Sequence, residues 1–336
     1  MMSTGVRRLF VCAFSYVMIA GFPPPVRAQA WLPPQGEGVV SFIFQDQYFK
    51  YHMLPTTRVD LGPTRSRSML VDVTYGVTDK VSVSVGLPWM ATKYSGRSPH
   101  PLQDFSGPTP LDNGNWHSTT QDFRFDLRYN VTRNLLGKGI VVTPYVGSIL
   151  PSHDYPFFAH AGYGRQLKEV QVGVAAAKLF EEAGHLLVQG RYGYGFTEKV
   201  LDISHNRSVA SLEVGYFVTP RLRLMALSSG QRTHGGIDLT PNARAVLPAE
   251  QFLHHDQITR DIGLSVGAGA SFSLTQTFDV YGSWLRTVTQ RNGHLLDRGV
   301  TVGLSWSFST RRAVGRGIAR AEEKSLTRCV CEKTGM

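Results

Sequence analysis

The residues best suited to chemistry in this sequence are charged and amide side chains that recur at every second position. In the stretch QDFRFDLRYNVTR, Arg124, Asp126 and Arg128 alternate strictly with Phe125 and Leu127. Such groups can brace neighbouring strands as ion pairs, or select solutes by charge if they line a pore. The pattern predicts one inward-facing polar set: Asp72, Asp122, Arg124, Asp126, Arg128, Gln189, Arg191, Glu213 and Asp261.

Histidines form a second group with chemical potential, because most of them stand beside carboxylate, amide or hydroxyl residues. Imidazole in that setting suits zinc or copper ligation, hydrogen bonding within a loop, or recognition of a polar ligand. No two histidines lie two or four residues apart on a regular element, so we expect no metal site. The clusters predict a polar rim: His153, Asp154, His205, Asn206, His234, His255, Asp256 and His294.

The elements that must position these side chains are β-strands, because successive side chains of a strand point to opposite faces. Near the end of the chain, for example, Val300, Val302 and Leu304 oppose Thr301 and Gly303. Twelve alternating segments are expected: 38–49, 67–78, 80–92, 119–132, 139–151, 166–179, 185–198, 206–219, 221–231, 258–274, 277–289 and 298–308.

The connections between these segments differ in length according to their position in the chain. Those after even-numbered segments are short, as at 79–80 and 275–276, whereas most of those after odd-numbered segments are long, as at 93–118 and 232–257. Short turns at one end and long loops at the other are typical of outer-membrane barrels, and a soluble sandwich has no reason to sort them. We predict an all-β fold, a transmembrane antiparallel up-and-down β-barrel of about 12 strands. The histidine-bearing rim would then be extracellular.

Aromatic residues recur where four strands end in a tight turn, in the pattern aromatic, any residue, Val or Leu, Thr. Rings at a fixed strand end are typical of the interfacial girdle of a membrane barrel. The predicted girdle also includes the last strand and consists of Tyr75, Tyr129, Tyr216, Phe272, Trp306 and Phe308.

Residues 1–30 have the features of a cleaved secretory signal peptide. A basic start and an apolar run over 9–22 precede the small-residue cleavage site Ala28-Gln29-Ala30. The run is shorter than the roughly 20 residues that a membrane-spanning helix needs. We therefore predict export of the chain, with a mature start near Trp31 and a barrel domain over 31–308.

Residues 309–336 form a basic segment, which we expect to be a disordered periplasmic tail. It holds Cys329 and Cys331, while residues 31–308 contain no cysteine, so disulfides do not hold the barrel together. The net charge is +10, and it falls to +3 for the barrel domain once the signal peptide and the tail are left out. Because positive and negative charges nearly balance in the barrel domain, its net charge gives no reason to expect a nucleic-acid partner.

A membrane hydrolase is one alternative function, since outer-membrane phospholipases are also twelve-stranded barrels that use a lipid-facing Ser–His pair. The His-x-Ser arrangement of that family is absent. His117 is followed directly by Ser118, and His205 lies three residues before Ser208. We therefore expect no enzyme activity, no catalytic residue and no cofactor.

The span 31–308 resembles a group of Gram-negative outer-membrane channel proteins, which includes proposed transporters linked to the meta-pathway of phenol degradation. The resemblance rests on LPPQGEGVVSFIFQDQYF (32–49), VTYGVTDKVSVSVGLPW (73–89) and QDFRFDLRYNV (121–131). It implies a barrel in the bacterial outer membrane through which small organic molecules pass. It carries over no binding residue, because fold analogy alone does not establish function.

We expect an outer-membrane channel that passes small polar or weakly amphipathic solutes passively through a charged lumen. Its partners would be outer-membrane lipid, the barrel-assembly machinery and the solute. A non-conducting receptor, adhesin or structural barrel is the first alternative, and a membrane phospholipase or esterase is the second.

Overall fold

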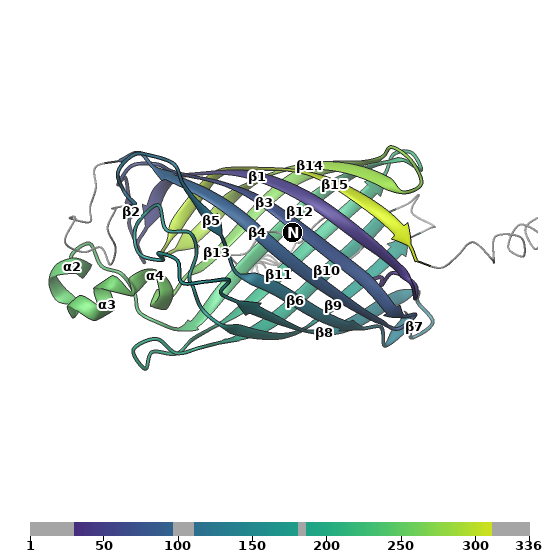
Figure 1. The fold of residues 1–336 in the computed structure, drawn as a ribbon, viewed down its shortest axis with the longest axis horizontal. Coiled ribbons are helices and arrows are strands. Elements are labelled where there is room, and N and C mark those ends of the chain that lie inside the picture. The colour runs from purple at the N-terminus through teal and green to yellow at the C-terminus, as the bar shows by residue number, and fades with distance from the viewer. Residues whose placement is uncertain (1–29, 97–110, 181–185, 311–336) are drawn as a thin grey trace, which may run out of the picture.

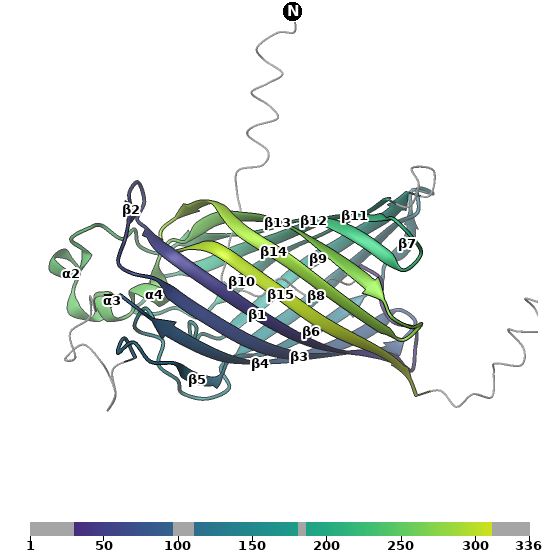
Figure 2. The same ribbon diagram turned by 90° about the horizontal axis from the view of Figure 1, so that it is seen from above.

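The computed structural model describes residues 30–96, 111–180 and 186–310. Within these ranges the chain forms a closed antiparallel β-barrel of 12 wall strands, which confirms the predicted fold class. The strands are tilted across the long axis of the barrel (Figures 1 and 2). All of the predicted signal peptide except Ala30 lies outside the described residues, as does the predicted tail from residue 311 onward.

The wall strands follow one another around the barrel in chain order, each antiparallel to the next. They are β1 (Glu37–Met53), β3 (Thr64–Thr78), β4 (Val81–Tyr94), β6 (Phe123–Tyr129), β8 (Ile140–Leu150), β9 (Glu169–Phe180), β10 (Leu186–Thr197), β11 (His205–Phe217), β12 (Leu222–Gly235), β13 (Ile262–Ser273), β14 (Phe278–Arg291) and β15 (His294–Ser309). Short strands and helices accompany them: β2 (Arg58–Val59), β5 (His117–Thr120), β7 (Thr132–Leu135), α2 (Ala243–Val246), α3 (Ala249–Leu253) and α4 (His255–Ile258). None of the helices in the described residues is long and apolar enough to cross a membrane.

The barrel closes where the first wall strand meets the last. β1 pairs with β15 along almost its whole length, from Glu37 opposite Ser309 to His52 opposite His294. Since no hydrocarbon-facing edge can keep unpaired backbone groups, this seam is required for a membrane-spanning sheet. It also places the ends of two strands far apart in sequence side by side at the mouth of the barrel.

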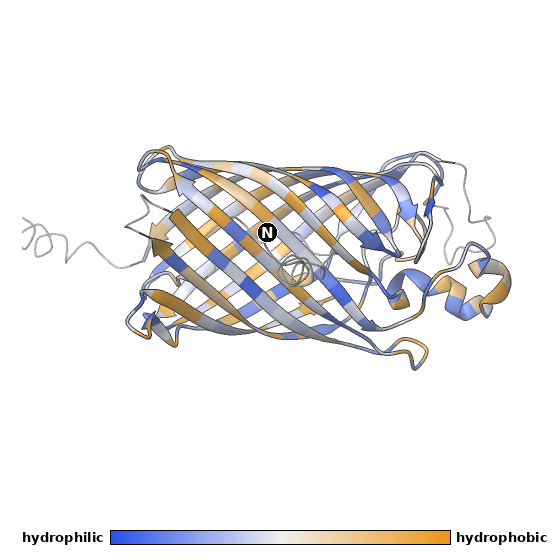
Figure 3. Cartoon of the chain, turned by 180° about the vertical axis from the view of Figure 1, so that it is seen from behind, coloured by the Kyte–Doolittle hydropathy of each residue, from blue (hydrophilic) through white to orange (hydrophobic). Residues whose placement is uncertain are grey.

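Side chains alternate between the outer surface and the lumen as the sequence predicts. In β15, Val302 is 54% exposed on the outer surface whereas Thr301 is 5% exposed and faces inward. Apolar and polar residues therefore alternate along the strands in Figure 3. In water an outer row of this kind would be unfavourable, but it suits contact with lipid.

The outer surface carries aromatic rings near the short turns and charges near the long loops. Tyr75 stacks on Phe308 with ring centroids 6.4 Å apart, while Asp46 at the other end binds Arg65 at 2.5 Å. Gly38, opposite Phe308, lies eight residues before Asp46. A strand of that length tilted by about 40° spans about 21 Å, close to the roughly 25 Å apolar band of such barrels. Four further residues of the predicted girdle are exposed on this surface: Tyr129, Tyr216, Phe272 and Trp306.

Two predicted strands differ from the structure. The expected segment 119–132 is divided among β5, β6 and β7. The expected segment 258–274 is shorter, because β13 begins only at Ile262. Ile258 is instead the fully buried last residue of α4, and Arg260 pairs with Asp238 of the preceding loop. The alternating pattern in the sequence therefore extends beyond the end of the strand, into residues whose backbone conformation is determined by loop contacts.

A segment at the start of the described chain enters the lumen from the end with the short turns. Thr143, an inward-facing residue of β8, donates a hydrogen bond to the carbonyl of Ala30 at 2.6 Å. Pro33 and Pro34 lie against Gly76, where an added Cβ would come within 2.4 Å of both of their carbonyl oxygens. Glycine at this position of β3 therefore makes room for the segment.

Replacing Val302 with Arg tests the orientation of the wall. The charge would enter the lipid-facing band two residues from its centre at Leu304, so we expect a loss of up to about 2–4 kcal/mol and poor assembly. Gln47→Arg is the matched control, because Gln47 lines the lumen cavity described below. Folding is measured by the heat-dependent gel shift, and equal damage from both variants would contradict the inward and outward assignment.

Candidate functional site

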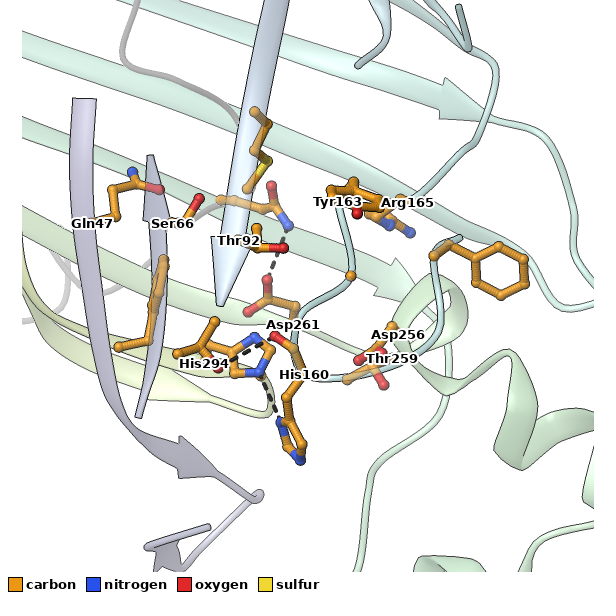
Figure 4. A pocket seen from close by; sticks show the side chains of 18 of the residues that line it. Gln47, Ser66, Thr92, His160, Tyr163, Arg165, Asp256, Thr259, Asp261 and His294 are labelled. Atoms are coloured by element: carbon orange, nitrogen blue, oxygen red, sulfur yellow. Dashed lines mark hydrogen bonds between the residues drawn. The ribbon is translucent and has the colours of Figure 1, made fainter. Parts of the chain in front are cut away.

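A cavity of about 280 Å³ lies in the lumen beneath the long loops (Figure 4). Its apolar lining includes Phe49, Met90, Phe157, Leu239 and Leu296. Its charged lining consists of Asp122, Arg124, Arg165, Glu169, Arg207, Asp256 and Asp261. Four carboxylates thus face three guanidinium groups, and the cavity can contact both the apolar and the polar parts of a small molecule.

The loop 151–168 between β8 and β9 folds into the barrel and supplies much of this lining. Its residues Tyr155, Ala161 and Tyr163 are buried together with Tyr94 of β4 and Leu111 of the preceding loop. Sequence reasoning missed this loop. Its unusual content of aromatic, alanine and glycine residues was the available signal, because such residues do not suit a solvated loop.

Hydrogen bonds to inward-facing wall residues hold the loop in place. Thr92 of β4 donates to the carbonyl of Ala161 at 2.5 Å. Asp112, in the connection before β5, accepts the backbone N–H of His160 at 3.2 Å and that of Ala161 at 3.0 Å. The side chain of Gln121 donates to the carbonyl of Tyr163. Four backbone polar groups of the buried loop are satisfied in this way.

The base of the same loop is tied to Asp122, which was predicted to face the lumen. The Tyr155 hydroxyl donates to the Asp122 carboxylate at 2.5 Å and accepts the N–H of Gln166 at 2.9 Å. Asp122 therefore anchors the loop as well as lining the cavity.

A second long loop, which carries α2, α3 and α4 between β12 and β13, closes over the first. Gln257 donates to the carbonyl of Arg165 at 2.8 Å, and the Arg165 guanidinium donates to the carbonyl of Gln257 in return. The rings of Phe157 and His254 stack with centroids 5.1 Å apart. The two loops thus form one connected cover over the cavity.

Deeper in the lumen, the charged residues of the wall are paired with one another. Asp126 binds Arg128 at 3.1 Å and Arg191 at 3.3 Å, and the Arg191 guanidinium lies 3.7 Å from the centroid of the Tyr145 ring. Arg128 lies on the same strand as Asp126, whereas Arg191 reaches Asp126 from β10, and both pairs reduce the cost of burying each charge. Arg124 differs from these residues because it also lines the cavity.

The remaining residues of the predicted inward set also lie on the inner face. Asp72 accepts a hydrogen bond from Thr74 at 3.4 Å, and Gln189 is buried. Glu213 binds Arg223 at 3.1 Å. The closest pair in this region was not among the predicted residues: Glu169 binds Arg207 at 2.5 Å. Arg207 alternates with Ser208 in β11, so the two-residue period could have identified it.

Asp261 lies just before β13 at the cavity wall and is an unusual carboxyl group. Burial raises its pKa to about 8, against the lowering effects of Arg165 and of the hydrogen bond from Gln290. Its two oxygens accept hydrogen bonds from Gln290 at 2.5 Å and from Gln231 at 3.3 Å. The cavity therefore holds an acid that changes charge near neutral pH.

Most of the predicted rim residues contact nearby loop or strand residues. These contacts join His153 to Thr119, Asp154 to Gln166, His205 to the carbonyl of Ile203, Asn206 to the N–H of Thr197, His234 to Ser208, and His255 to both the carbonyl of Phe252 and Asp256. They order the loops locally. The exception is His294, which meets two histidines that the predicted rim did not include.

The histidine–serine contacts differ from those considered in the sequence. Ser208 lies beside His234, not His205: the Ser208 hydroxyl is 2.8 Å from His234 Nε2 and 3.0 Å from the Tyr192 hydroxyl. His117 contacts Asn113 at 2.9 Å. These contacts place Ser208 in a hydrogen-bonded group with an exposed tyrosine at the outer surface.

Three histidines converge at the cavity wall. Nδ1 of His160, on the inward loop, lies 3.5 Å from Nε2 of His294 at the start of β15 (Figure 4). The His52 ring centroid, near the end of β1, lies 3.9 Å from that of His294 and 4.5 Å from that of His160. Because these residues are remote in sequence, their spacing gave no indication of this cluster.

Comparisons with known proteins agree with this architecture. No protein-family model matches the chain, and no curated protein matches it. Among solved structures, the chain is similar to the COG4313 outer membrane channel from Pseudomonas putida F1, with a TM-score of 0.63 and 13% identity over 84% of this chain and 99% of that one. It also matches the translocator domain of the autotransporter NalP from Neisseria meningitidis, with a TM-score of 0.45 and 14% identity over 82% and 90% of the two chains. The first of these supports the barrel fold.

The pKa of Asp261 predicts a pH-dependent stability. A raised carboxyl pKa means that the folded barrel loses stability as pH rises from the ordinary carboxyl range of about 4 through about 8. Asp261→Asn removes the ionisation, so its stability relative to wild type should improve between about pH 6 and about pH 9. Thermal unfolding is followed by the heat-dependent gel shift.

Asp238→Asn is the matched control for this measurement. Burial acts to raise the pKa of Asp238, but hydrogen bonds from Arg291 and Asn292 and the charge of Arg260 hold it below its usual range. Asp238 therefore stays ionised between about pH 6 and about pH 9, and the effect of its replacement should not change over that interval. The same pH dependence for both variants would contradict the assignment to Asp261.

Proposed function

We propose that this protein is a channel of the Gram-negative outer membrane, through which small polar or weakly amphipathic solutes pass down their gradients. The observation that carries this proposal is the cavity inside a closed barrel, with charged and apolar side chains on its wall. Its charges are nearly balanced, which favours solutes that have polar and apolar parts over strongly charged ones. A role in passage of aromatic compounds, as in the phenol-degradation group, is the more specific form of this proposal.

The inward loop is the constriction in this proposal. Loop 151–168 covers the cavity and is held by Asp112, Thr92 and Asp122. Solutes would enter past the two connected loops, contact the cavity wall and then pass the paired charges around Asp126. In this proposal the chain is exported, inserted into the outer membrane by the barrel-assembly machinery, and surrounded there by lipid.

A non-conducting barrel is a second candidate, favoured by the occupation of the lumen at both ends. Loop 151–168 lies at one end and the segment that begins with Ala30 lies at the other. A folded barrel of this kind that carries no ion current would act by binding at the loops. Conductance distinguishes the two candidates directly.

Replacing Arg124 with Ala tests whether the cavity lies on the conduction path. Removal of a positive charge from the wall should shift ion selectivity toward cations. The measurement is the reversal potential of the purified mature protein in planar bilayers under a potassium chloride gradient. Arg286→Ala is the control, since Arg286 lies on the outer surface and pairs with Asp297. A wild-type barrel that folds and never conducts would contradict the channel proposal.

Replacing Asp112 with Ala tests whether loop 151–168 forms the constriction. The change removes the acceptor of two backbone N–H groups of the buried loop, so the loop should be held less firmly. We expect larger or more variable single-channel steps. Asp154→Ala is the control, because Asp154 contacts Gln166 within the exposed part of the same loop. Identical steps in wild type and Asp112→Ala would show that the loop does not limit conduction.

A further inference from the structure

Three elements bring His52, His160 and His294 to one point of the cavity wall. His52 and His294 lie opposite each other at the end of the β1–β15 seam. His160 comes from loop 151–168, in which its own N–H and the following N–H are both bound by Asp112. One ring nitrogen from each histidine lies within 4.8 Å of the others.

The backbone and ring of His160 are held independently of the other two histidines. Thr64 of β3 donates to the carbonyl of His160 at 3.3 Å, and the His160 ring stacks on Tyr94 with centroids 4.6 Å apart at 17°. His160 is buried, whereas His52 and His294 are partly exposed. Two ligands at strand ends and one on a well-held loop form a site whose geometry the fold establishes in advance.

The spacing of the three rings suits a transition-metal ion. Nitrogen ligands about 2.05 Å from a tetrahedral zinc ion lie about 3.3 Å from one another. The His160 and His294 nitrogens are already 3.5 Å apart, and the set spans at most 4.8 Å. Small side-chain rotations of His52 and His294, which both line the cavity, would complete the arrangement.

We propose that His52, His160 and His294 bind a divalent transition-metal ion, of which zinc is the ion to test first. Three imidazoles favour zinc, copper or nickel over the oxygen-seeking calcium and magnesium ions. A fourth position, open toward the cavity, remains for water or a solute. The alternative is a hydrogen-bonded histidine cluster without metal, which would bind zinc no better than scattered surface histidines.

Metal binding would join loop 151–168 to the seam that closes the barrel. The ligands come from the loop and from both strands of the seam, so the ion would cross-link all three. This consequence rests on the proposed channel, because a loop tied to the wall should narrow the path for solutes. Binding of the ion itself does not depend on conduction.

The test uses the folded mature barrel in detergent, purified without a polyhistidine tag and treated with chelator, with Cys329 and Cys331 replaced by serine because a Cys-x-Cys pair can itself bind zinc. Equilibrium dialysis with zinc should give one ion per chain, and calcium should give none. His52→Gln, His160→Gln and His294→Gln should each weaken zinc binding by about 100-fold or more, since loss of even an outer partner of a metal ligand typically costs 10–100-fold. The heat-dependent gel shift shows that each variant is folded.

Two controls make the result specific. His153→Gln and His234→Gln replace loop histidines outside the cluster, and zinc binding should not change. Cobalt(II), bound in place of zinc to wild-type protein, should show the strong visible absorption of a tetrahedral site, which does not depend on any variant folding. Absence of saturable zinc binding, or equal loss in cluster and control variants, would overturn the proposal.

A bilayer recording separates this site from the channel proposal. Zinc added on the long-loop side should reduce the conductance of wild type and leave His160→Gln unaffected. Specific zinc binding to a barrel that never conducts would support the metal site and contradict the channel. Conduction without specific zinc binding would support the channel and contradict the metal site.

Discussion

The pairing of β1 with β15 is the constraint on which the rest of this structure depends. Within hydrocarbon every backbone N–H and C=O must be paired by the protein itself, so a spanning sheet has to close. Closure sends alternate side chains inward, and it produces a lumen whose contents the sequence must satisfy. It also brings His52 and His294 together across most of the chain.

The polar groups inside the barrel follow from that closure. At mid-depth they satisfy one another, as Asp126 does with Arg191. Nearer the long loops the inward-facing residues bind loop backbone instead, as Thr92 does. The cavity lies between the level at which wall residues pair with each other and the level at which they bind the loops. Its lining is mixed because both the wall strands and the loops contribute residues to it.

The sequence predicted the wall well because a strand in a barrel has one simple rule. Val302 and Thr301 show it: each side chain meets either lipid or lumen, so alternation alone assigns the face. The rule failed near Ile258, where apolar residues continue the pattern into α4 and burial comes from loop packing. Local periodicity cannot distinguish these two causes of an apolar residue.

The site was less predictable because it depends on contacts between remote residues. Single inward residues such as Asp122 and Asp261 follow from alternation, but their partners on the loops do not. The approach of His160 to His294 requires both the closed seam and the inward course of loop 151–168. The residues next to His160 and His294 in the sequence do not indicate that these two side chains contact each other.

Loop 151–168 is held inside the lumen against β4, and both the proposed constriction and the proposed metal site depend on this position. The most direct measurement is cross-linking, by a short bifunctional thiol reagent, of cysteines placed at Thr92 and Ala161 in a chain whose Cys329 and Cys331 are replaced by serine. We expect rapid cross-linking of the folded barrel, because the Thr92 hydroxyl lies 2.5 Å from the Ala161 carbonyl and the two residues are therefore neighbours. A folded barrel in which the two thiols are not linked and both react freely with a water-soluble monofunctional reagent would contradict this position of the loop.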